Sequence, residues 1–390
     1  MTPTIAARFN GRDNNFNLIR FLAASAVLLD HCVALGAGGH PRLLQLGPLT
    51  FDFAAFPIGR MAVDVFFVVS GFLVTRSALT RPTVTDYVVA RALRLFPALI
   101  VVSLAVALLL GPLVTTLPLS AYFTDLKTWI YGPITASLAD NNSPLPGVFE
   151  TGPAPGIINS PLWTLRYEAI CYVLLAGLAM VGALINRRIA YSFAGLFAAY
   201  LLVTFATPWR GEVAAIDSAA RFVLSFFLGG FFFVFAEKIR LHWLAVLGAA
   251  ALAWVTRETV FAELTFRIAL AYGVIWLALV PGGAIRGFNR LGDYSYGLYI
   301  LCWPVQQTLI LAMPQASALV LFAVSFPVTL ALAALSWHLV EHPALRQKER
   351  AMRKADATVV WLNKRVAGLR GERHQVRQAP KLMPPETPTR

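Results

Sequence analysis

The chain has 390 residues, of which 57% are hydrophobic and 14% are charged, and its net charge is +13. Because soluble globular proteins devote about a quarter of their residues to charge, this composition excludes a water-soluble fold and indicates a polytopic membrane protein. The positive residues lie in short clusters between apolar blocks and in the last 45 residues, which is typical of topology signals and argues against a nucleic-acid partner.

Ten apolar blocks follow one another along the chain, and each is close to the length of about 20 residues that crosses a bilayer as a helix. The first block follows a polar leader and is long enough to span, so we interpret it as a membrane helix and not as a cleaved signal peptide. We therefore predict an all-α, polytopic integral membrane protein with about ten transmembrane helices. The blocks cover 17–37, 61–80, 94–113, 161–183, 190–208, 219–236, 241–256, 261–281, 294–313 and 317–340.

The predicted domain organisation is a cytoplasmic leader over 1–16, a transmembrane domain over 17–341 and a basic, largely disordered cytoplasmic tail over 342–390. With a cytoplasmic N-terminus, the outer loops contain only five basic residues, which are Arg42, Arg60, Lys127, Arg210 and Arg257. Positive residues concentrate on the cytoplasmic side of membrane proteins, so both termini are predicted to be cytoplasmic. We expect the tail to contact anionic membrane lipids and to have no catalytic role.

The first block contains three ionisable residues, Arg20, Asp30 and His31. At about 100° and 1.5 Å per residue, Arg20 and His31 lie about 20° from the same helix face and about 16 Å apart along the axis. Arg20 could snorkel to the lipid headgroups while Asp30 and His31 only bond neighbouring helices. Because ionisable groups inside a span are costly and usually mark function, we favour a functional role for this face.

The second and third blocks add further candidates. The sequence "DVFFVVSGF" puts Asp64 at the outer edge and the Ser70–Gly71 pair near mid-depth, where it serves either helix packing or the site. Arg91 and Arg94 are three residues apart at the inner end of the third block, so they share a helix face. They suit phosphate binding or topological anchoring equally well.

The connection over 114–160 is rich in Pro, Gly and Asn. We expect irregular backbone there, at the outer membrane surface, and the segment is either an acceptor-binding lid or a plain connector.

The fourth block opens with "INSPLWTLRYE" and carries Glu168 about seven residues from its outer end, a depth similar to that of His31. An acid beside an imidazole can make the histidine a general base, so His31 and Glu168 are the predicted catalytic residues. Glu168 could instead pair with Arg166 or Arg221.

The remaining predictions concern the two substrates. Arg20, Arg91, Arg94 and Arg76 lie near the inner rim and would bind the phosphates of a coenzyme A thioester, whose arm could bridge about 16 Å to His31. The residues expected to contact an outer substrate are Asp30, Asp64, Ser70, Asn159 and Trp163. No metal is expected, because the three cysteines lie in apolar segments without metal-ligand spacing.

Six motifs give the chain a family resemblance: the Arg20–His31 spacing, "DVFFVVSGF", "RALR", "INSPLWTLRYE", "YSYGLYILCWPV" and "HLVEHP". Together, from about Asn17 to Pro343, they resemble the acyltransferase 3 family of membrane O-acyltransferases. The resemblance implies transfer of an acetyl or other short acyl group from cytoplasmic acyl-CoA, most simply acetyl-CoA, to a hydroxyl of an extracytoplasmic glycan. The glycan would be an exopolysaccharide, O-antigen or nodulation-type oligosaccharide, either lipid-linked or finished, and the enzyme would lie in a bacterial inner membrane.

The resemblance also implies residue roles. His31 would be the essential histidine, Arg20 its paired arginine, Arg91 with Arg94 the donor-binding motif, and Glu168 the acid after the tryptophan motif. "LRYE" departs from relatives that have a proline and an apolar residue before the acid, so the role of Arg166 is open.

Two mechanisms and two rival functions are consistent with the residues. His31 could activate the acceptor for direct attack on the thioester, or the acyl group could pass through an acylated Ser70. A secondary transporter or flippase could use the same ionisable residues as a pathway, although we find no internal repeat that would support it. A noncatalytic scaffold or sensor is the other alternative.

Overall fold

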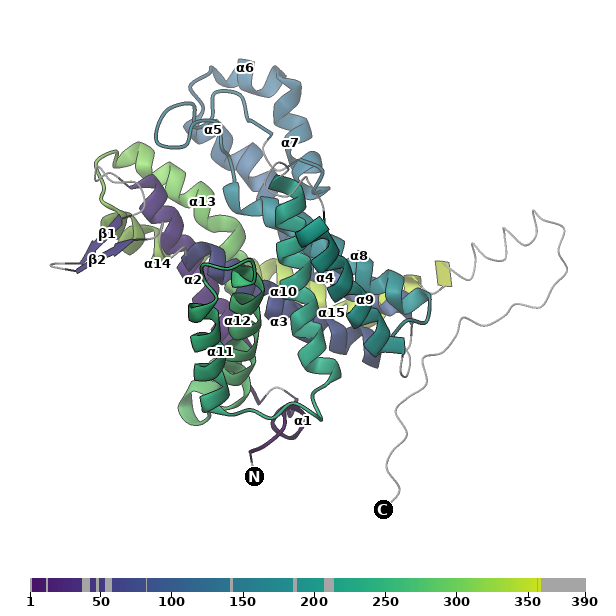
Figure 1. Cartoon of the computed structure of the whole chain (residues 1–390). Coiled ribbons are helices and arrows are strands. Elements are labelled where there is room, and N and C mark those ends of the chain that lie inside the picture. The colour runs from purple at the N-terminus through teal and green to yellow at the C-terminus, as the bar shows by residue number, and fades with distance from the viewer. Residues whose placement is uncertain are drawn as a thin grey trace, which may run out of the picture.

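The computed structural model is helical apart from one β-hairpin (Figure 1). It describes residues 2–358 except 12, 37–42, 47–48, 53–57, 82, 141–142, 185–187, 207–213 and 356. The first half contains α1 (Ile5–Arg8), α2 (Phe16–Leu35), β1 (Leu43–Leu46), β2 (Leu49–Asp52), α3 (Ile58–Thr80), α4 (Val84–Ala105), the π-helix η1 (Val106–Leu110), α5 (Gly111–Val114), α6 (Leu119–Thr124) and α7 (Leu126–Ala136). The second half contains the 3-10 helix η2 (Ser160–Leu162), α8 (Trp163–Met180), α9 (Arg188–Ala206), α10 (Ala214–Val234), α11 (Trp243–Val255), α12 (Ala262–Leu279), the 3-10 helix η3 (Gly283–Arg290), α13 (Ser295–Ala312), α14 (Ala318–Ser336), the π-helix η4 (Trp337–Glu341) and α15 (His342–Arg346).

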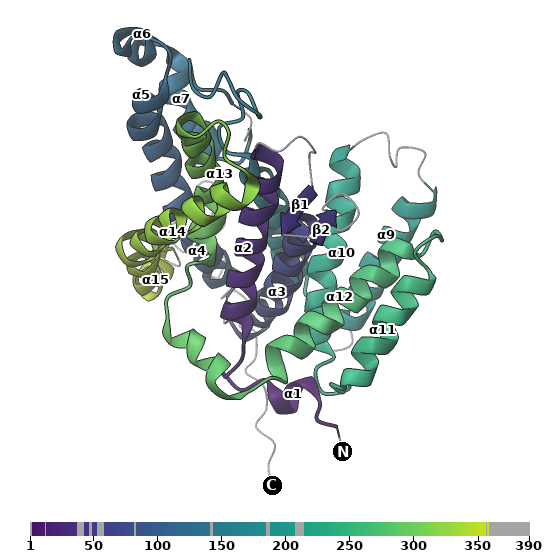
Figure 2. The ribbon, with the colours of Figure 1, turned by 90° about the vertical axis from the view of Figure 1, so that its left-hand side faces the viewer.

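Helices α2 and α3 form the centre of the fold (Figure 2). On one side α2 contacts α13 and α14, and on the other α3 packs on α10 and α12. Helix α6 lies at one end of the molecule and the short N-terminal helix α1 at the opposite end (Figures 1 and 2). This arrangement leaves the face between α2, α3, α4, α8 and α13 to form the site.

Several helices begin where the sequence supplies a capping side chain. Thr83 accepts a hydrogen bond from the backbone N–H of Asp86 at the start of α4, and Asp125 and Ser317 cap α7 and α14 in the same way. Such caps satisfy backbone donors that the first helical turn leaves without a partner. The capping residues therefore determine where these helices start, whereas the apolar blocks of the sequence locate only their membrane-spanning parts.

Seven helices in the described ranges are long and apolar enough to cross a membrane. The predicted blocks at 190–208, 241–256 and 294–313 are also helical, as α9, α11 and α13, but none is among these seven. Helix α11 has only 13 residues, which is about 20 Å of helix against a hydrocarbon core of about 30 Å. The ten-span count and the location of the termini therefore remain predictions.

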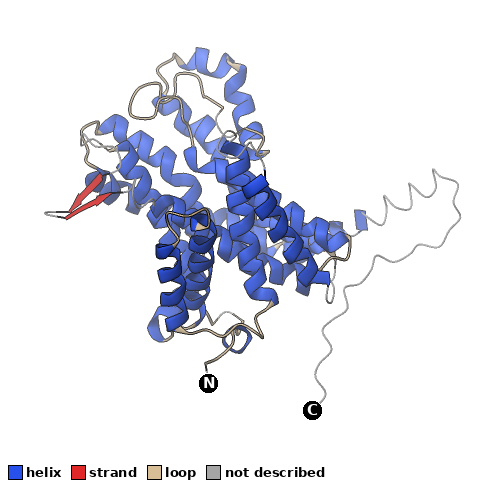
Figure 3. Ribbon diagram, in the orientation of Figure 1, coloured by secondary structure: helices blue, strands red, loops and turns tan. Residues whose placement is uncertain are grey.

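The prediction of irregular backbone over 114–160 is wrong for its first part, because residues 119–124 and 126–136 form α6 and α7. The buried residues of α7 recur at helical spacing, at Thr128, Tyr131, Gly132 and Thr135. Gly132 and Pro133 hide this pattern when the segment is assessed by composition alone. The short β1–β2 hairpin was also not predicted; its strands pair antiparallel, with Leu43 opposite Asp52 (Figure 3).

The predicted disordered tail is helical at its start. Residues 342–346 form α15, and after a turn at Gln347 the helix resumes over 348–355. The part from 359 to 390 lies outside the described residues.

Helices α3 and α10 make backbone contact at two glycines. A Cβ atom added at Gly71 would lie 1.8 Å from the carbonyl oxygen of Phe226, and one added at Gly229 would lie 2.0 Å from that of Val68. The packing role weighed for the Ser70–Gly71 pair is therefore confirmed for Gly71. A backbone oxygen cannot rotate away, so a larger side chain at either position must separate the helices.

We expect Gly71→Ala to destabilise the protein by about 1–3 kcal/mol, the usual range for an overpacked contact. Thermal unfolding of the purified protein in detergent measures this effect. Gly177→Ala on α8 is the matched control, because a Cβ atom there meets nothing within 4 Å. Equal melting temperatures for the two variants would contradict the close contact.

Candidate functional site

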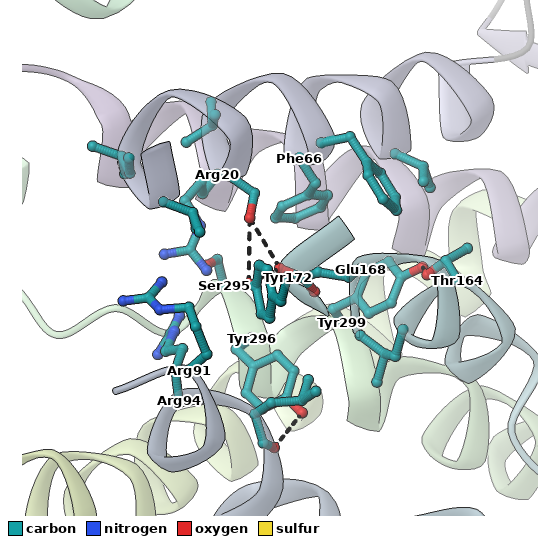
Figure 4. A pocket seen from close by; sticks show the side chains of 18 residues that line it. Arg20, Phe66, Arg91, Arg94, Thr164, Glu168, Tyr172, Ser295, Tyr296 and Tyr299 are labelled. Atoms are coloured by element: carbon teal, nitrogen blue, oxygen red, sulfur yellow. Dashed lines mark hydrogen bonds between the residues drawn. The ribbon is translucent and has the colours of Figure 1, made fainter. Parts of the chain in front are cut away.

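A cavity lined by charged residues lies between α2, α3, α4, α8 and α13, and we call it the arginine cavity (Figure 4). Its polar lining includes Arg20, Ser70, Arg91, Arg94, Glu168 and Tyr172. Figure 4 shows the three arginines gathered at one end of the cavity, with Thr164 and Tyr299 at the other. Three of the four arginines predicted to bind the donor therefore lie together, while their binding of phosphate stays a prediction.

Arg20 and Arg94 are held by two acids. Asp293 pairs with Arg20 and, through Oδ2, with Nη2 of Arg94 at 2.7 Å, while Nη1 of Arg94 lies 3.0 Å from Oε2 of Glu341. Burial alone would raise the pKa of Asp293, but the two guanidinium groups and a hydrogen bond from Ser295 outweigh it and lower the pKa to about 2. These ion pairs neutralise most of the charge of both arginines.

Arg91 differs from its two neighbours. Within the described part of the chain it has no ion pair with a carboxylate, and its Nε atom is buried without a hydrogen-bond partner. Its guanidinium carbon lies 5.8 Å from the ring centroid of Tyr172. Arg91 is therefore the cavity arginine most available to an anionic ligand.

Glu168 is held by two hydroxyl groups. Ser70 donates a hydrogen bond from Oγ to Oε1 of Glu168 at 3.1 Å, and the hydroxyl of Tyr172 donates to the same oxygen. The alternative partners weighed from sequence bond elsewhere: Arg166 donates to backbone carbonyls of residues 138 and 139, and Arg221 pairs with Asp64. Ser70 therefore does face the site, while the adjacent Gly71 packs on α10.

A second cavity adjoins the first, and we call it the imidazole cavity. It is lined by Asp30, His31, Arg60, Trp163, Arg221 and Phe222. Val63, Thr164 and Tyr299 line both cavities and so form the wall between them. The hydroxyls of Thr164 and Tyr299 are 2.6 Å apart.

This wall changes two sequence interpretations. Arg20 and His31 open onto different, adjoining cavities, so the single passage inferred from the first helix is divided. Glu168 and His31, predicted to act as a pair, also line different cavities. Their similar depth did not bring them together, because Glu168 extends toward Ser70 and Tyr172.

The other predicted contact residues are placed as follows. Asp64 forms a buried pair with Arg221, at 2.9 and 3.0 Å, at the side of the imidazole cavity. Trp163 lines that cavity and is 40% exposed. Asn159 is buried and donates to the backbone carbonyl of residue 300, and Arg76 lies over the ring of Phe9 and lines neither cavity.

Sequence reasoning missed Asp293, Glu341 and Tyr172. Glu341 lies within the motif "HLVEHP", and Asp293 directly precedes "YSYGLYILCWPV", but neither acid is assigned a role by sequence reasoning. Buried arginines need acids, and this requirement could have identified the two carboxylates. Tyr172 is four residues after Glu168 and thus on the same helix face.

No group of three or more His, Cys, Asp or Glu residues suited to a metal occurs in the part of the chain that the structure describes. The arrangement instead offers a cation, a carboxylate with two hydroxyl donors, and an imidazole across a thin wall. These groups can bind an anion and move a proton.

Comparisons with known proteins agree over nearly the whole chain. A family profile described as "Acyltransferase domain", of the acyltransferase 3 type, matches residues 13–338. The chain is 28% identical over 342 residues to an "O-acetyl transferase" of Shigella phage Sf6, a match that covers 85% of this chain and 95% of that relative. It is 30% identical over 372 residues to "Nodulation protein 10" of Rhizobium leguminosarum bv. viciae, covering 86% of this chain and 94% of that relative.

A third relative is "Exopolysaccharide production protein ExoZ" of Rhizobium meliloti (strain 1021), with 29% identity over 274 residues, 63% of this chain and 76% of that relative. No solved structure matches the chain.

The ion pairs of Asp293 give a stability prediction. Asp293→Asn leaves the partly buried guanidinium groups of Arg20 and Arg94 short of a carboxylate, so we expect a loss of about 2–4 kcal/mol in the free energy of unfolding, somewhat below that for a fully buried pair. The folded-state pKa of Asp293, about 2, is below its ordinary value of about 3.9, so this stabilisation is present above pH ~4 and is lost as the pH falls toward 2. The difference in melting temperature between parent and variant should therefore narrow over that range.

Glu258→Gln serves as the control, because Glu258 pairs with Arg257 at 3.4 Å in an exposed position and should contribute little. A parent–variant difference at Asp293 that stays constant from pH 7 to pH 2 would contradict the assignment.

Proposed function

The chain belongs to the acyltransferase 3 family and is an O-acyltransferase, and from that premise we propose that it moves a short acyl group from acyl-CoA to a glycan hydroxyl outside the cytoplasm. The observation that carries the proposal is the pair of adjoining cavities, one with an arginine that has no carboxylate partner among the described residues and one with an imidazole. Two relatives are named for nodulation and for exopolysaccharide production, which supports an exported glycan as the acceptor. Family membership favours the enzyme over the transporter and the scaffold.

The donor would occupy the arginine cavity. Arg91 would bind a phosphate of coenzyme A, and the pantetheine arm would extend toward the wall formed by Val63, Thr164 and Tyr299. Arg20 and Arg94 are paired with Asp293, so they would hold this end of the cavity in shape and would not bind phosphate directly. One relative is named an O-acetyl transferase, which supports an acetyl group as the acyl group that is transferred.

The acceptor would occupy the imidazole cavity. The half-exposed ring of Trp163 offers an apolar face to a sugar, and Asp30 and Arg60 offer polar groups to its hydroxyls. His31 would remove the proton of the reacting hydroxyl, whose oxygen then forms the ester bond while the carbon–sulfur bond breaks. The proton would finally reach the coenzyme A thiolate.

Glu168 would act from the donor side. With Ser70 and Tyr172 it forms a fixed polar group one helical turn from the wall residue Thr164, next to the expected position of the thioester. This location supports a role in positioning the donor and not in orienting His31.

Transfer would also require the hydroxyls of Thr164 and Tyr299 to separate.

A direct assay tests the proposed function. Purified protein in detergent is given acetyl-CoA labelled in the acetyl group together with surface polysaccharide from cells that lack the gene. We expect label in the polysaccharide as an ester, with release of free coenzyme A and without any ion gradient. Gradient-dependent movement of an unchanged solute, with no ester formed, would instead support the transporter.

His31→Ala should lower the rate of acyl transfer by about 10²- to 10⁴-fold, the usual contribution of a general base. The variant should fold normally, which thermal unfolding can confirm. His338→Ala is the control, because His338 is exposed and lines neither cavity. Transfer by the His31 variant at the parent rate would exclude His31 as the base.

Arg91 and Arg94 should respond differently to alanine. Arg91→Ala should raise the KM for acyl-CoA about ten-fold with little change in melting temperature, since Arg91 has no carboxylate partner among the described residues. Arg94→Ala should lower stability by about 3–5 kcal/mol, because it removes a partner of both Asp293 and Glu341. Steady-state kinetics and thermal unfolding of both variants test this division, and equal effects on both quantities would argue against it.

A further inference from the structure

A second group of cations lies beside the mouth of the arginine cavity, and we call it the rim cluster. It consists of Arg81 in the turn between α3 and α4, Arg91 on α4, and Lys348 at the start of the helix over 348–355. Nε of Arg81 donates to Oγ of Ser77 at 2.7 Å, and its Nη1 lies 3.9 Å from Sδ of Met352. The segment after α14 is thus attached to the α3–α4 turn, and α15 contacts α4, the helix that carries Arg91.

The three cations act on one another. Burial lowers the pKa of Arg81, and the charge of Arg91 lowers it further. Burial likewise lowers the pKa of Lys348, as do the charges of Arg81 and Arg91. Asp86 opposes both shifts, and the exposed Glu349 opposes only that of Lys348. The three partly buried cations therefore outnumber the acids beside them.

A comparison with Arg20 and Arg94 indicates why this excess of positive charge points to a ligand. Arg20 and Arg94 are at the same end of the fold, and Asp293 and Glu341 neutralise them. Within the described part of the chain, no ion pair is formed by Arg81, Arg91 or Lys348. Gathering like charges in this way is unfavourable in the absence of a ligand and becomes favourable when a polyanion binds. Arg91 belongs both to the rim cluster and to the arginine cavity, so an anion bound at the rim is continuous with the path toward the wall.

We propose that Arg81, Arg91 and Lys348 bind the phosphate-rich end of the donor, the 3′-phosphate and diphosphate of coenzyme A. This inference rests on the proposed function and extends it, because it makes the beginning of the basic tail part of the donor site. The arginine forks can each bind two oxygens of one phosphate, and the lysine can act as a point charge for another. The pantetheine arm then enters the cavity past Arg91, with the acyl group foremost.

The test compares two donors that carry the same acyl group. Acetyl-CoA has the three phosphates, and S-acetylpantetheine has none. We expect Lys348→Gln and Arg81→Gln each to lower the ratio of kcat/KM for acetyl-CoA to kcat/KM for S-acetylpantetheine by about ten-fold. A purely structural role would change both donors alike and leave this ratio at the parent value. Arg350→Gln, an exposed position on the same helix, should keep the parent ratio.

Direct binding separates this inference from the proposed function. Adenosine 3′,5′-bisphosphate should bind the parent protein in detergent and bind each rim variant about ten-fold more weakly by calorimetry. Lys348→Arg keeps the charge and should bind nearly as well as the parent, which also controls for folding. Parent-like binding by Lys348→Gln and Arg81→Gln would overturn the inference even if acyl transfer occurs, and weakened binding supports it even if no acceptor is ever modified.

An anionic lipid headgroup has similar chemistry and is the other source of phosphate. The same variants are therefore reconstituted in vesicles of phosphatidylcholine alone and of phosphatidylcholine with phosphatidylglycerol. A bisphosphate affinity that depends on Arg81 and Lys348 in both vesicles supports the donor site. Variants that change only the response to phosphatidylglycerol would show that the cluster holds lipid, and would overturn it.

Discussion

The pairing of the partly buried Arg20 and Arg94 with Asp293 and Glu341 is the interaction on which the site depends. A buried guanidinium without a partner costs several kcal/mol, so α2 and α4 could not bring Arg20 and Arg94 into the bundle without these acids. Arg20, Arg94, Asp293 and Glu341 belong to four separate segments of the chain. Their ion pairs therefore fix the ends of these segments relative to one another, and those ends form the mouth of the arginine cavity.

Helix α3 links the packing of the fold to the chemistry of the site. Gly71 must lack a side chain because the backbone of α10 touches it, and Ser70, about 100° around the helix, points to Glu168 instead. Val63 is seven residues earlier, so it lies on nearly the same face as Ser70 and about 10 Å further along the axis, at the wall. One helix thus holds the bundle together and lines both cavities.

The sequence could predict which residues are costly to bury, but not which partners they find. Ionisable groups inside a membrane span are costly and usually mark function, and this identified Arg20, Asp30, His31 and Glu168. The depth of Glu168 could also be counted along its helix. Its direction could not, because it depends on how α8 is rotated against α3, which places Ser70 within reach.

The same limit explains the errors in the fold. Composition marked 114–160 as irregular because Pro and Gly are frequent there, but the burial of Thr128, Tyr131 and Thr135 stabilises α7 in spite of Pro133. The start of the tail was expected to be disordered because of its charge. Arg81 and Met352 show why it is not, since a contact with the α3–α4 turn holds it.

The wall between the cavities gives the proposed reaction an order. A thioester next to an imidazole and water would be hydrolysed, and enzymes avoid such losses by closing the site until both substrates are bound. Here Thr164 and Tyr299 are hydrogen-bonded to each other, and Tyr299 also donates to the backbone carbonyl of residue 161 at 3.1 Å. Each such bond contributes about 1 kcal/mol net, so breaking them requires far less free energy than the binding of a sugar and a coenzyme A thioester can supply. A wall of this strength would keep the donor from water in the absence of acceptor and still open when the glycan fills the imidazole cavity.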